Sequence, residues 1–290
     1  MTGGRGAADG PRATDGSGTA GGPRPVPDRL GVARLLACVL ARELRDGEIV
    51  AFGLHAELLL AAALLAQRLH APNLAIRHGL RVERGADLQP AAWTAERASR
   101  SHEAIEYLES HDAILDVANP GSPLRFCDVF LIGGMQIDRE GSTNLIGIKG
   151  SDGRMKVRGP GSIGTTSIGT LARHVILFSG EHTVRRFVER VDYVSVPGWR
   201  RRAAAGLEGG PSLCVTPLAV LEFQDGSMRL RSVHPHASEE EVRRRTGFPL
   251  PAGAAPRTPA PTAAERAALE VVDPFDRLAA VDLRPDGGEP

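Results

Sequence analysis

Apolar and polar positions alternate in a regular order over the first ordered-looking third of the chain. Leucine and alanine recur at helical spacing over 30–44, and Asp46-Gly47 supplies a turn that ends this helix. A strand-length apolar run at 48–54 is followed by a second, almost entirely apolar helix at 56–69 and a strand at 74–79. This helix–strand–helix–strand order predicts an α/β fold with an open, largely parallel sheet and helices on both faces.

The same kind of patterning predicts the remaining elements and divides the chain into three parts. Further strands are predicted at 126–134, 175–178, 191–196, 214–216, 219–223 and 228–233, with a hairpin turn at 224–227, and helices at 101–110, 239–246 and 262–271. Residues 1–27 lack apolar bulk and are expected to be disordered. Residues 28–250 form the α/β domain, and 251–290 are a Pro/Ala-rich extension, interpreted as a strap over a partner.

Composition and charge narrow the function classes. The 290 residues carry 35 basic and 35 acidic side chains, so no net field attracts nucleic acid or an anionic membrane. The basic runs at 200–202 and 243–245 are therefore interpreted as solvated surfaces, and a content of 4 % aromatic residues leaves little for base stacking. The longest apolar stretch, 58–66, is too short to span a bilayer. A soluble, cytoplasmic protein without nucleic-acid or membrane partners is expected.

Neither a metal site nor a disulfide framework is predicted. Cys38, Cys127 and Cys214 are far apart and form no CxxC pair, which fits a reducing cytoplasm. Glu181-His182 resembles a pair of metal ligands but has no third ligand at a usable spacing. The segment His234-Pro235-His236 is expected on the surface.

A glycine-rich segment at 157–170 can be interpreted in two ways. Gly159, Gly161, Gly164 and Gly169 allow backbone N–H groups to approach a phosphate or oxyanion, and Arg158 can add a positive charge. The alternative is a loop that only needs positive φ at several positions, and composition alone favours this alternative.

A second segment places bare backbone at the end of a strand. The buried strand at 126–134 ends in Gly133-Gly134, at the edge of a parallel sheet where ligands of open α/β folds gather. Gln136, Asp138 and Asn144 then either contact a ligand or only fix a turn between two strands.

Several of these stretches, in this order, resemble the β subunits of family I CoA-transferases, most closely the glutaconate CoA-transferase type. The matching stretches are 126–138, 144–146, 158–162 and 185–198, and the resemblance covers about 30 to 250. It implies a CoA-transferase β-subunit-like fold, an α subunit as obligatory partner and an active site between the two. It also implies that an acyl-CoA thioester is the substrate, that no cofactor is permanently bound, and that CoA moves between an acyl-CoA and a carboxylic acid. The residues then expected to bind CoA or substrate are Gly133, Gly134, Gln136, Asn144, Arg158, Gly159, Gly161 and Ser162.

The chain departs from the family at the nucleophile. The family's glutamate lies in a Ser-Glu-Asn-Gly-like turn after the second strand, where this chain has Ile76-Arg77-His78-Gly79. Arginine cannot form a glutamyl anhydride, so Arg77 and His78 become the candidate catalytic residues, Arg77 as a partner for a carboxylate or phosphate and His78 as an acid or base. The nearest carboxylates, Glu57 and Glu83, are interpreted as helix-terminus or surface charges.

Three accounts of this departure remain open. The partner subunit carries the essential carboxylate and the enzyme hydrolyses a carbon–carbon bond of a CoA thioester in a catabolic ring opening. Alternatively, the chain serves a transferase with a carboxylate elsewhere, or it is a noncatalytic partner.

Overall fold

The computed structural model describes residues 28–53, 56–78, 81–84, 105–108, 127–162 and 164–288. The core of the molecule is a nine-stranded sheet with the order β14-β13-β12-β10-β5-β1-β2-β3-β4. Its strands are β1 (Ile49–Phe52), β2 (Ala75–His78), β3 (Arg81–Arg84), β4 (Ile105–Leu108), β5 (Val129–Ile132), β10 (His174–Phe178), β12 (Gly210–Val215), β13 (Ala219–Gln224) and β14 (Ser227–Val233).

The middle of this sheet is parallel and its two edges are antiparallel. Strands β12, β10, β5, β1 and β2 run parallel to one another, whereas β3 and β4 on one side and β13 and β14 on the other pair antiparallel. The turn between β13 and β14 is formed by Asp225 and Gly226, both with positive φ, as a tight hairpin requires. The prediction of an open, largely parallel sheet is confirmed.

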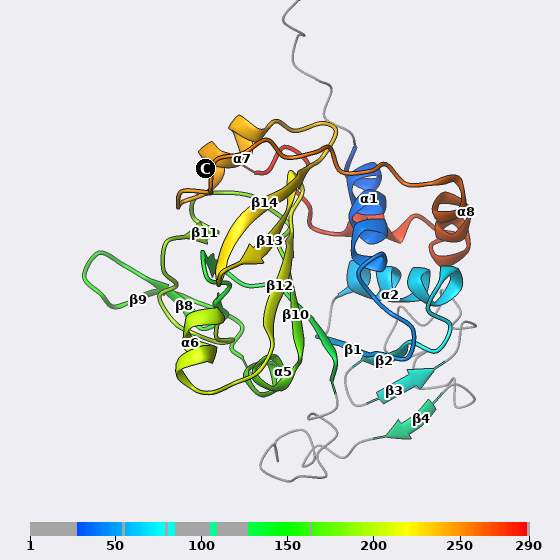
Figure 1. The fold of residues 1–290 in the computed structure, drawn as a ribbon, viewed down its shortest axis with the longest axis horizontal. Helices are drawn as coiled ribbons and strands as arrows, with labels where there is room; N and C mark the ends of the chain where they lie inside the picture. Colours follow the sequence, from blue (N-terminus) through cyan, green and yellow to red (C-terminus); the bar gives the residue numbers. More distant parts are fainter. Residues whose placement is uncertain are drawn as a thin grey trace, which may run out of the picture.

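Helices cover both faces of the sheet (Figure 1). On one face lie α1 (Arg29–Ala41), α2 (Glu57–Leu69) and α8 (Ala263–Val272), whose leucines, valines and alanines pack with inward residues of β1 and β5. The opposite face packs against α5 (Thr165–Leu171), α7 (Glu239–Arg245) and a three-stranded sheet. That small sheet is formed by β6 (Gln136–Asp138), β7 (Thr143–Asn144) and β11 (Phe187–Val188).

The other elements extend this second layer. A hairpin of β8 (Gly147–Lys149) and β9 (Met155–Arg158) projects from the body, as Figure 1 shows. The short helix α6 (Trp199–Ala204) packs beside β12, and a 3₁₀ turn spans Arg277–Ala280. Among the helices in the described part of the chain, none combines the length and the apolar character needed to cross a membrane.

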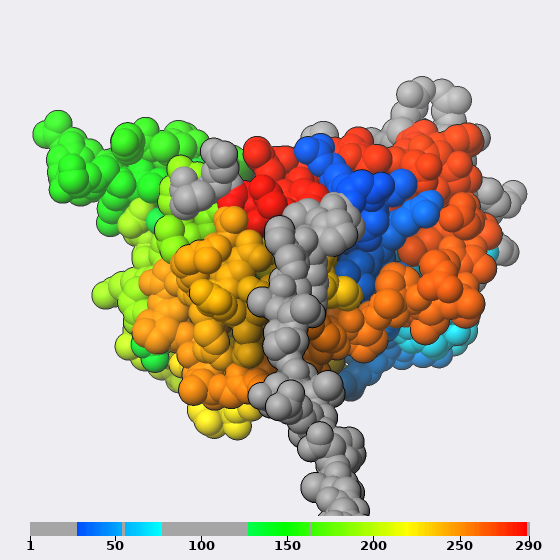
Figure 2. All heavy atoms as spheres, turned by 90° about the horizontal axis from the view of Figure 1, so that it is seen from above, coloured from blue at the N-terminus to red at the C-terminus, as the bar shows by residue number. Residues whose placement is uncertain are grey.

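The C-terminal segment lies on this same chain. A capping box of Thr262 and Glu265 begins α8, and Arg42 of α1 pairs with Glu265 at 2.6 Å. The hydrogen bond from Arg42 lowers the pKa of Glu265 to about 2. Beyond α8 the chain runs back over the molecule, where Arg284 N donates to Gly180 O at 2.8 Å, and Figure 2 shows these red residues between the blue α1 and the yellow-green second layer.

Four local predictions are wrong, each because tertiary contacts override a local pattern. The described part of the helix expected at 101–110 is strand β4, since a four-residue apolar run does not distinguish helix from strand. Residues 191–196 form turns, because the Asp192 carboxylate accepts from Lys149 N and the Ser195 hydroxyl accepts from Leu145 N. The other two errors concern polar side chains. Arg202 is buried and donates to backbone carbonyls of 169–172 and 208–209, and His234 is fully buried rather than on the surface.

Candidate functional site

A cavity lies at the carboxyl ends of three adjacent parallel strands, β1, β5 and β10. Its volume is about 420 Å³. Ligands of open α/β sheets bind at this edge, because the loops that leave neighbouring strands converge there. The lining residues are Gly53, Ala56, Glu57, Leu58, Leu59, Phe130, Leu131, Ile132, Gly133, Gly134, Met135, Leu145, Thr165, Phe178, Ser179, Gly180, Arg186 and Val281.

Gly133 and Gly134 bring bare backbone to this cavity. The N–H of neither glycine donates a hydrogen bond to any residue that the structure describes. A Cβ on Gly134 would lie 2.9 Å from Gln136 O, and one on Gly133 would lie 3.1 Å from Phe178 O. The close packing explains why glycines occupy both positions, and the two unpaired N–H groups provide donors for an oxyanion.

Arg186 fixes the position of this glycine turn. Its guanidinium donates to Gly134 O and to the Glu181 carboxylate, with Nε and Nη2 at 3.0 and 2.7 Å from Oε1. Ser179 lies on the same side, with its hydroxyl donating to Glu181 O at 2.7 Å. The polar wall of the cavity therefore consists of groups that already hold one another in place. The sequence match includes Arg186, but nothing in its local pattern indicated that it would line the cavity.

Glu57 is the first residue of α2 and forms another part of the wall. The N-cap, Ala56, has no side-chain acceptor for the first N–H groups of the helix. Glu57 is half-buried and makes no hydrogen bond or ion pair with a described residue. Of the residues that line the cavity, only Glu57 and Arg186 carry a full charge.

Arg77 and His78 occupy the last two positions of β2. The register places them opposite Ala51 and Phe52 of β1, which leads directly to Gly53 at the cavity. The backbone thus brings both candidates to the correct edge of the sheet. Glu83 lies in β3, in register with Ile76.

Gln136 and Asn144 lie inside the molecule and not at the cavity. Asn144 Nδ2 donates to Gln136 Oε1 at 2.7 Å, and Gln136 Nε2 donates to Asp192 Oδ2 at 3.1 Å. Asn144 O also accepts from Met135 N at 2.7 Å, which fixes the segment after Gly134. Asp138 is buried too, and its carboxylate accepts from Ser142 N at 2.8 Å within a turn. Burial raises the pKa of Asp138, and these bonds give the three polar residues structural partners.

The glycine-rich segment borders the cavity through its neighbours. Gly159 N donates to Ile146 O and Gly161 N to Leu145 O, so the loop packs on the backbone beside Leu145. Gly161 has positive φ, and a Cβ on Gly159 would lie 2.3 Å from Leu145 O. Arg158 is exposed, with Nη1 2.8 Å from Ile146 O, and Ser162 is half-buried. These contacts explain the glycines without a ligand and leave the other Arg158 donors open to solvent.

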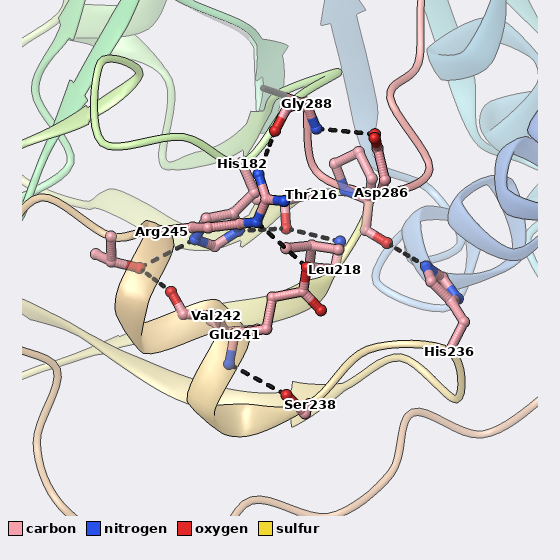
Figure 3. A network of polar contacts seen from close by, with 12 residues as sticks. His182, Thr216, Leu218, His236, Ser238, Glu241, Val242, Arg245, Asp286 and Gly288 are labelled. Atoms are coloured by element: carbon pink, nitrogen blue, oxygen red, sulfur yellow. Dashed lines mark hydrogen bonds and ion pairs between the residues drawn. The ribbon is translucent and has the colours of Figure 1, made fainter. Parts of the chain in front are cut away.

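The buried histidines form a separate network behind the cavity wall (Figure 3). His182 contacts the Thr216 hydroxyl through Nδ1 at 2.9 Å and the Thr246 hydroxyl through Nε2 at 3.0 Å, and it stacks on Phe187. His234 contacts Thr258 Oγ1 and Thr216 O. Burial lowers the pKa of each histidine to about 3, so both are neutral. They have structural partners and do not line the cavity.

Within the described ranges no group of three or more histidine, cysteine, aspartate or glutamate residues is placed to hold a metal ion. Cys38, Cys127 and Cys214 are all buried and no disulfide joins them, and burial raises the pKa of Cys38 to about 12. The chemistry available at this site is therefore that of backbone N–H groups, a carboxylate, a guanidinium and a hydroxyl.

The sequence matches the B-type subunit of glutaconate CoA-transferase from Acidaminococcus fermentans. The two chains are 31 % identical over 261 residues, which cover 82 % of this chain and 91 % of that relative. This chain belongs to the family of glutaconate CoA-transferase B-type subunits. No protein-family model matches the chain.

Solved structures of CoA-transferase-like proteins share the fold. Crystalline glutaconate CoA-transferase from Acidaminococcus fermentans superimposes with a TM-score of 0.69 at 27 % identity, over 86 % of this chain and 96 % of that one. The decarboxylase AibA/AibB gives 0.68 over 87 % and 98 %, and IpdAB of Rhodococcus jostii RHA1 gives 0.69 over 89 % and 99 %. Both of these are 24 % identical to this chain, and their likeness concerns the fold alone.

Proposed function

We propose that this chain is the B-type subunit of a heteromeric CoA-transferase, which moves CoA between an acyl-CoA and a carboxylic acid. The observation that carries this proposal is the cavity at the carboxyl ends of β1, β5 and β10, with Gly133 and Gly134 in its wall, in a member of this family. The acyl-CoA thioester is a substrate here, not a permanently bound cofactor.

The unpaired N–H groups of Gly133 and Gly134 suit the chemistry of a thioester carbonyl. When a nucleophile adds to that carbonyl, negative charge develops on its oxygen, and preorganised N–H donors stabilise the oxyanion. A carboxylate nucleophile fits such a site because each step exchanges one activated acyl bond for another of similar energy. Arg186 contributes by holding the Gly134 carbonyl, which orients the turn.

The other predicted site residues take supporting roles in this proposal. Arg77, at the end of β2, pairs with a substrate carboxylate, and His78 beside it moves a proton or polarises the substrate. Arg158 meets a CoA phosphate near Gly159, Gly161 and Ser162. Gln136 and Asn144 act from behind, by shaping the segment that follows Gly134.

An α-type partner subunit completes the enzyme. The similar curated protein is by its name one of two kinds of subunit, which supports a two-chain assembly. The β8–β9 hairpin projects from the body with Met155 and Val157 exposed, and a two-stranded hairpin is marginally stable by itself. A partner contact at this hairpin would stabilise it. We place the heteromer in the cytoplasm, where buried thiols such as Cys38 remain reduced.

One observation favours a second candidate function. The position that corresponds to the family's glutamate is Arg77 in the aligned sequence, and arginine forms no acyl intermediate. A hydrolase that opens a ring of a CoA-linked catabolic intermediate would use water as nucleophile and a carboxylate of the α-type subunit. A noncatalytic role for this chain is the third candidate.

Acceptor dependence distinguishes these functions. The complex with its α-type partner is incubated with a panel of acyl-CoAs, with and without carboxylic acid acceptors, and the products are identified by mass spectrometry. A transferase produces new acyl-CoA only when an acceptor is present. Products that incorporate solvent oxygen without any acceptor would indicate the hydrolase, and full turnover by the partner alone would indicate a noncatalytic chain.

A further inference from the structure

Glu57 differs from the other acidic residues around the cavity because no described residue binds its carboxylate. Glu181 is held by Arg186, with an oxygen–nitrogen distance of 2.7 Å, and Asp192 is held by Gln136 and Lys149 N. Glu57 lines the cavity, is half-buried, and makes neither an ion pair nor a hydrogen bond within the described part of the chain. An unengaged carboxylate in a cavity with a matching pair of N–H donors is available for chemistry.

The sheet order places Glu57 beside the position where the family's glutamate is replaced. Strands β1 and β2 are neighbours, with Ala51 opposite Arg77 and Phe52 opposite His78. Neighbouring strands lie about 4.8 Å apart. The segment that leaves β1 and begins α2 at Glu57 therefore starts one strand away from Arg77, and a carboxylate supplied from there reaches the same edge of the sheet.

The surroundings of Glu57 favour the ionised carboxylate that a nucleophile requires. The uncapped N-terminus of the 13-residue helix α2 presents positive partial charge to Glu57. Gly133 and Gly134 line the same cavity and can stabilise the oxyanion that an attack produces.

We propose that Glu57 is the nucleophile of this enzyme, supplied from the strand next to the family's usual position. This assignment rests on the proposed transferase function. A Glu57 oxygen attacks the acyl-CoA carbonyl, the carbon–sulfur bond breaks, and CoA leaves as a thiolate from an acyl-glutamyl anhydride. The thiolate then attacks the Glu57 side-chain carbonyl carbon, and the donor acid leaves as a carboxylate.

The second half of the reaction reverses these steps with the acceptor. The acceptor carboxylate attacks the Glu57–CoA thioester, displaces the CoA thiolate and forms a new anhydride. The thiolate attacks the acceptor's acyl carbon, which yields the new acyl-CoA and restores the Glu57 carboxylate. Electrons and protons balance without an oxidant, a reductant or a metal.

Trapping of the thioester tests the assignment directly. The complex with its α-type partner is incubated with acyl-CoA and then with borohydride, which reduces a glutamyl thioester to an alcohol, and peptide mass spectrometry locates the modified residue. We expect the modification at Glu57. Glu57→Gln is expected to lower acceptor-dependent turnover by at least about 10³-fold, while the melting temperature and subunit assembly stay unchanged. Glu270→Gln is the matched control, because Glu270 lies on the surface of α8 with an exposed side chain.

The possible failures are distinguishable. Acceptor-dependent turnover with the modification on another carboxylate, or with full activity in Glu57→Gln, overturns the assignment and leaves the proposed function intact. A wild-type complex that yields only products of water attack, with Glu57 unmodified, overturns both.

Discussion

Two polar clusters lie within a few residues of each other on the loop after β10, and their hydrogen-bonding groups are used in opposite ways. In the histidine network, both ring nitrogens of His182 have partners, and His182 N donates to Gly287 O at 2.7 Å. At the cavity, the N–H groups of Gly133 and Gly134 have no described acceptor, and Glu57 has no described partner.

Histidine is the residue type most often associated with catalysis, yet the cluster that contains it is the one built for stability. Buried polar groups without partners are costly, so a fold leaves them unpaired where a ligand completes them and pairs them elsewhere. The presence of unpaired groups at a cavity is therefore a better guide to the site than the residue types alone. Because the two clusters use different residues, substitutions can perturb one cluster at a time.

The largest expected effect is acid destabilisation through the histidine network. The ordinary histidine pKa is 6.5, and burial lowers the pKa of His182 and His234 to about 3. As the pH falls below 6.5, the unfolded chain binds two protons that the folded chain does not bind, so stability falls with pH. We expect a loss of roughly 4 kcal/mol in the free energy of unfolding between about pH 7.5 and pH 5, measured by urea denaturation.

Variants sharpen this expectation. His182→Phe keeps a ring in the site and removes one of the two groups, so it is expected to halve the pH dependence. His174→Phe, at the exposed start of β10, is the matched control and should leave the pH dependence unchanged. Constant stability of the wild-type chain across this range would show that the histidines are not neutral and paired as the structure has them.

The next effect is on activity and concerns the cavity. Gly53 ends β1, lines the cavity, has no positive φ, and a Cβ there would meet no atom within 4 Å. Gly53→Leu therefore fills the cavity without a clash in the described structure. We expect kcat/KM of the complex to fall by about 100-fold with little change in melting temperature, a transition-state cost of about 2.7 kcal/mol.

Gly53→Ala provides the graded control for that substitution. Its single methyl occupies much less of the cavity, and a smaller loss of activity is expected. Equal activity of the leucine and alanine variants would indicate that substrate does not occupy this cavity. A collapse of stability in Gly53→Ala would mean that Gly53 has a conformational role instead.

The sequence predicts the sheet better than it predicts the site. Alternating helices and apolar strands up to residue 79 suffice for the parallel centre, because burial of those runs allows few other arrangements. The strand expected at 191–196 and the surface position expected for His234 failed because side-chain partners distant in sequence decide both. For the same reason, local pattern could not show that Gln136 and Asn144 bind each other, or that Glu57 and Arg186 line one cavity. Chemistry depends on which loops converge, and only the fold supplies that.

The smallest effect concerns Arg186, which connects the two clusters. It follows the loop that contains His182, and its guanidinium holds both Glu181 and the Gly134 carbonyl at the cavity. Lysine keeps the charge but cannot reproduce the planar, forked set of donors. Arg186→Lys is therefore expected to loosen the glycine turn and to lower kcat/KM by about tenfold, mainly through kcat, with a small change in stability.

The exposed Arg190 provides the control substitution, Arg190→Lys, which should leave activity unchanged. The split between kcat and KM decides which role Arg186 has. A positioning residue alters how well the Gly133 and Gly134 N–H groups meet the developing oxyanion, and that contact strengthens only in the transition state. A loss confined to KM would place Arg186 in direct substrate binding. Unchanged kinetics together with reduced stability would assign Arg186 to the structural cluster, and the boundary between the two clusters would then lie at Gly134 itself.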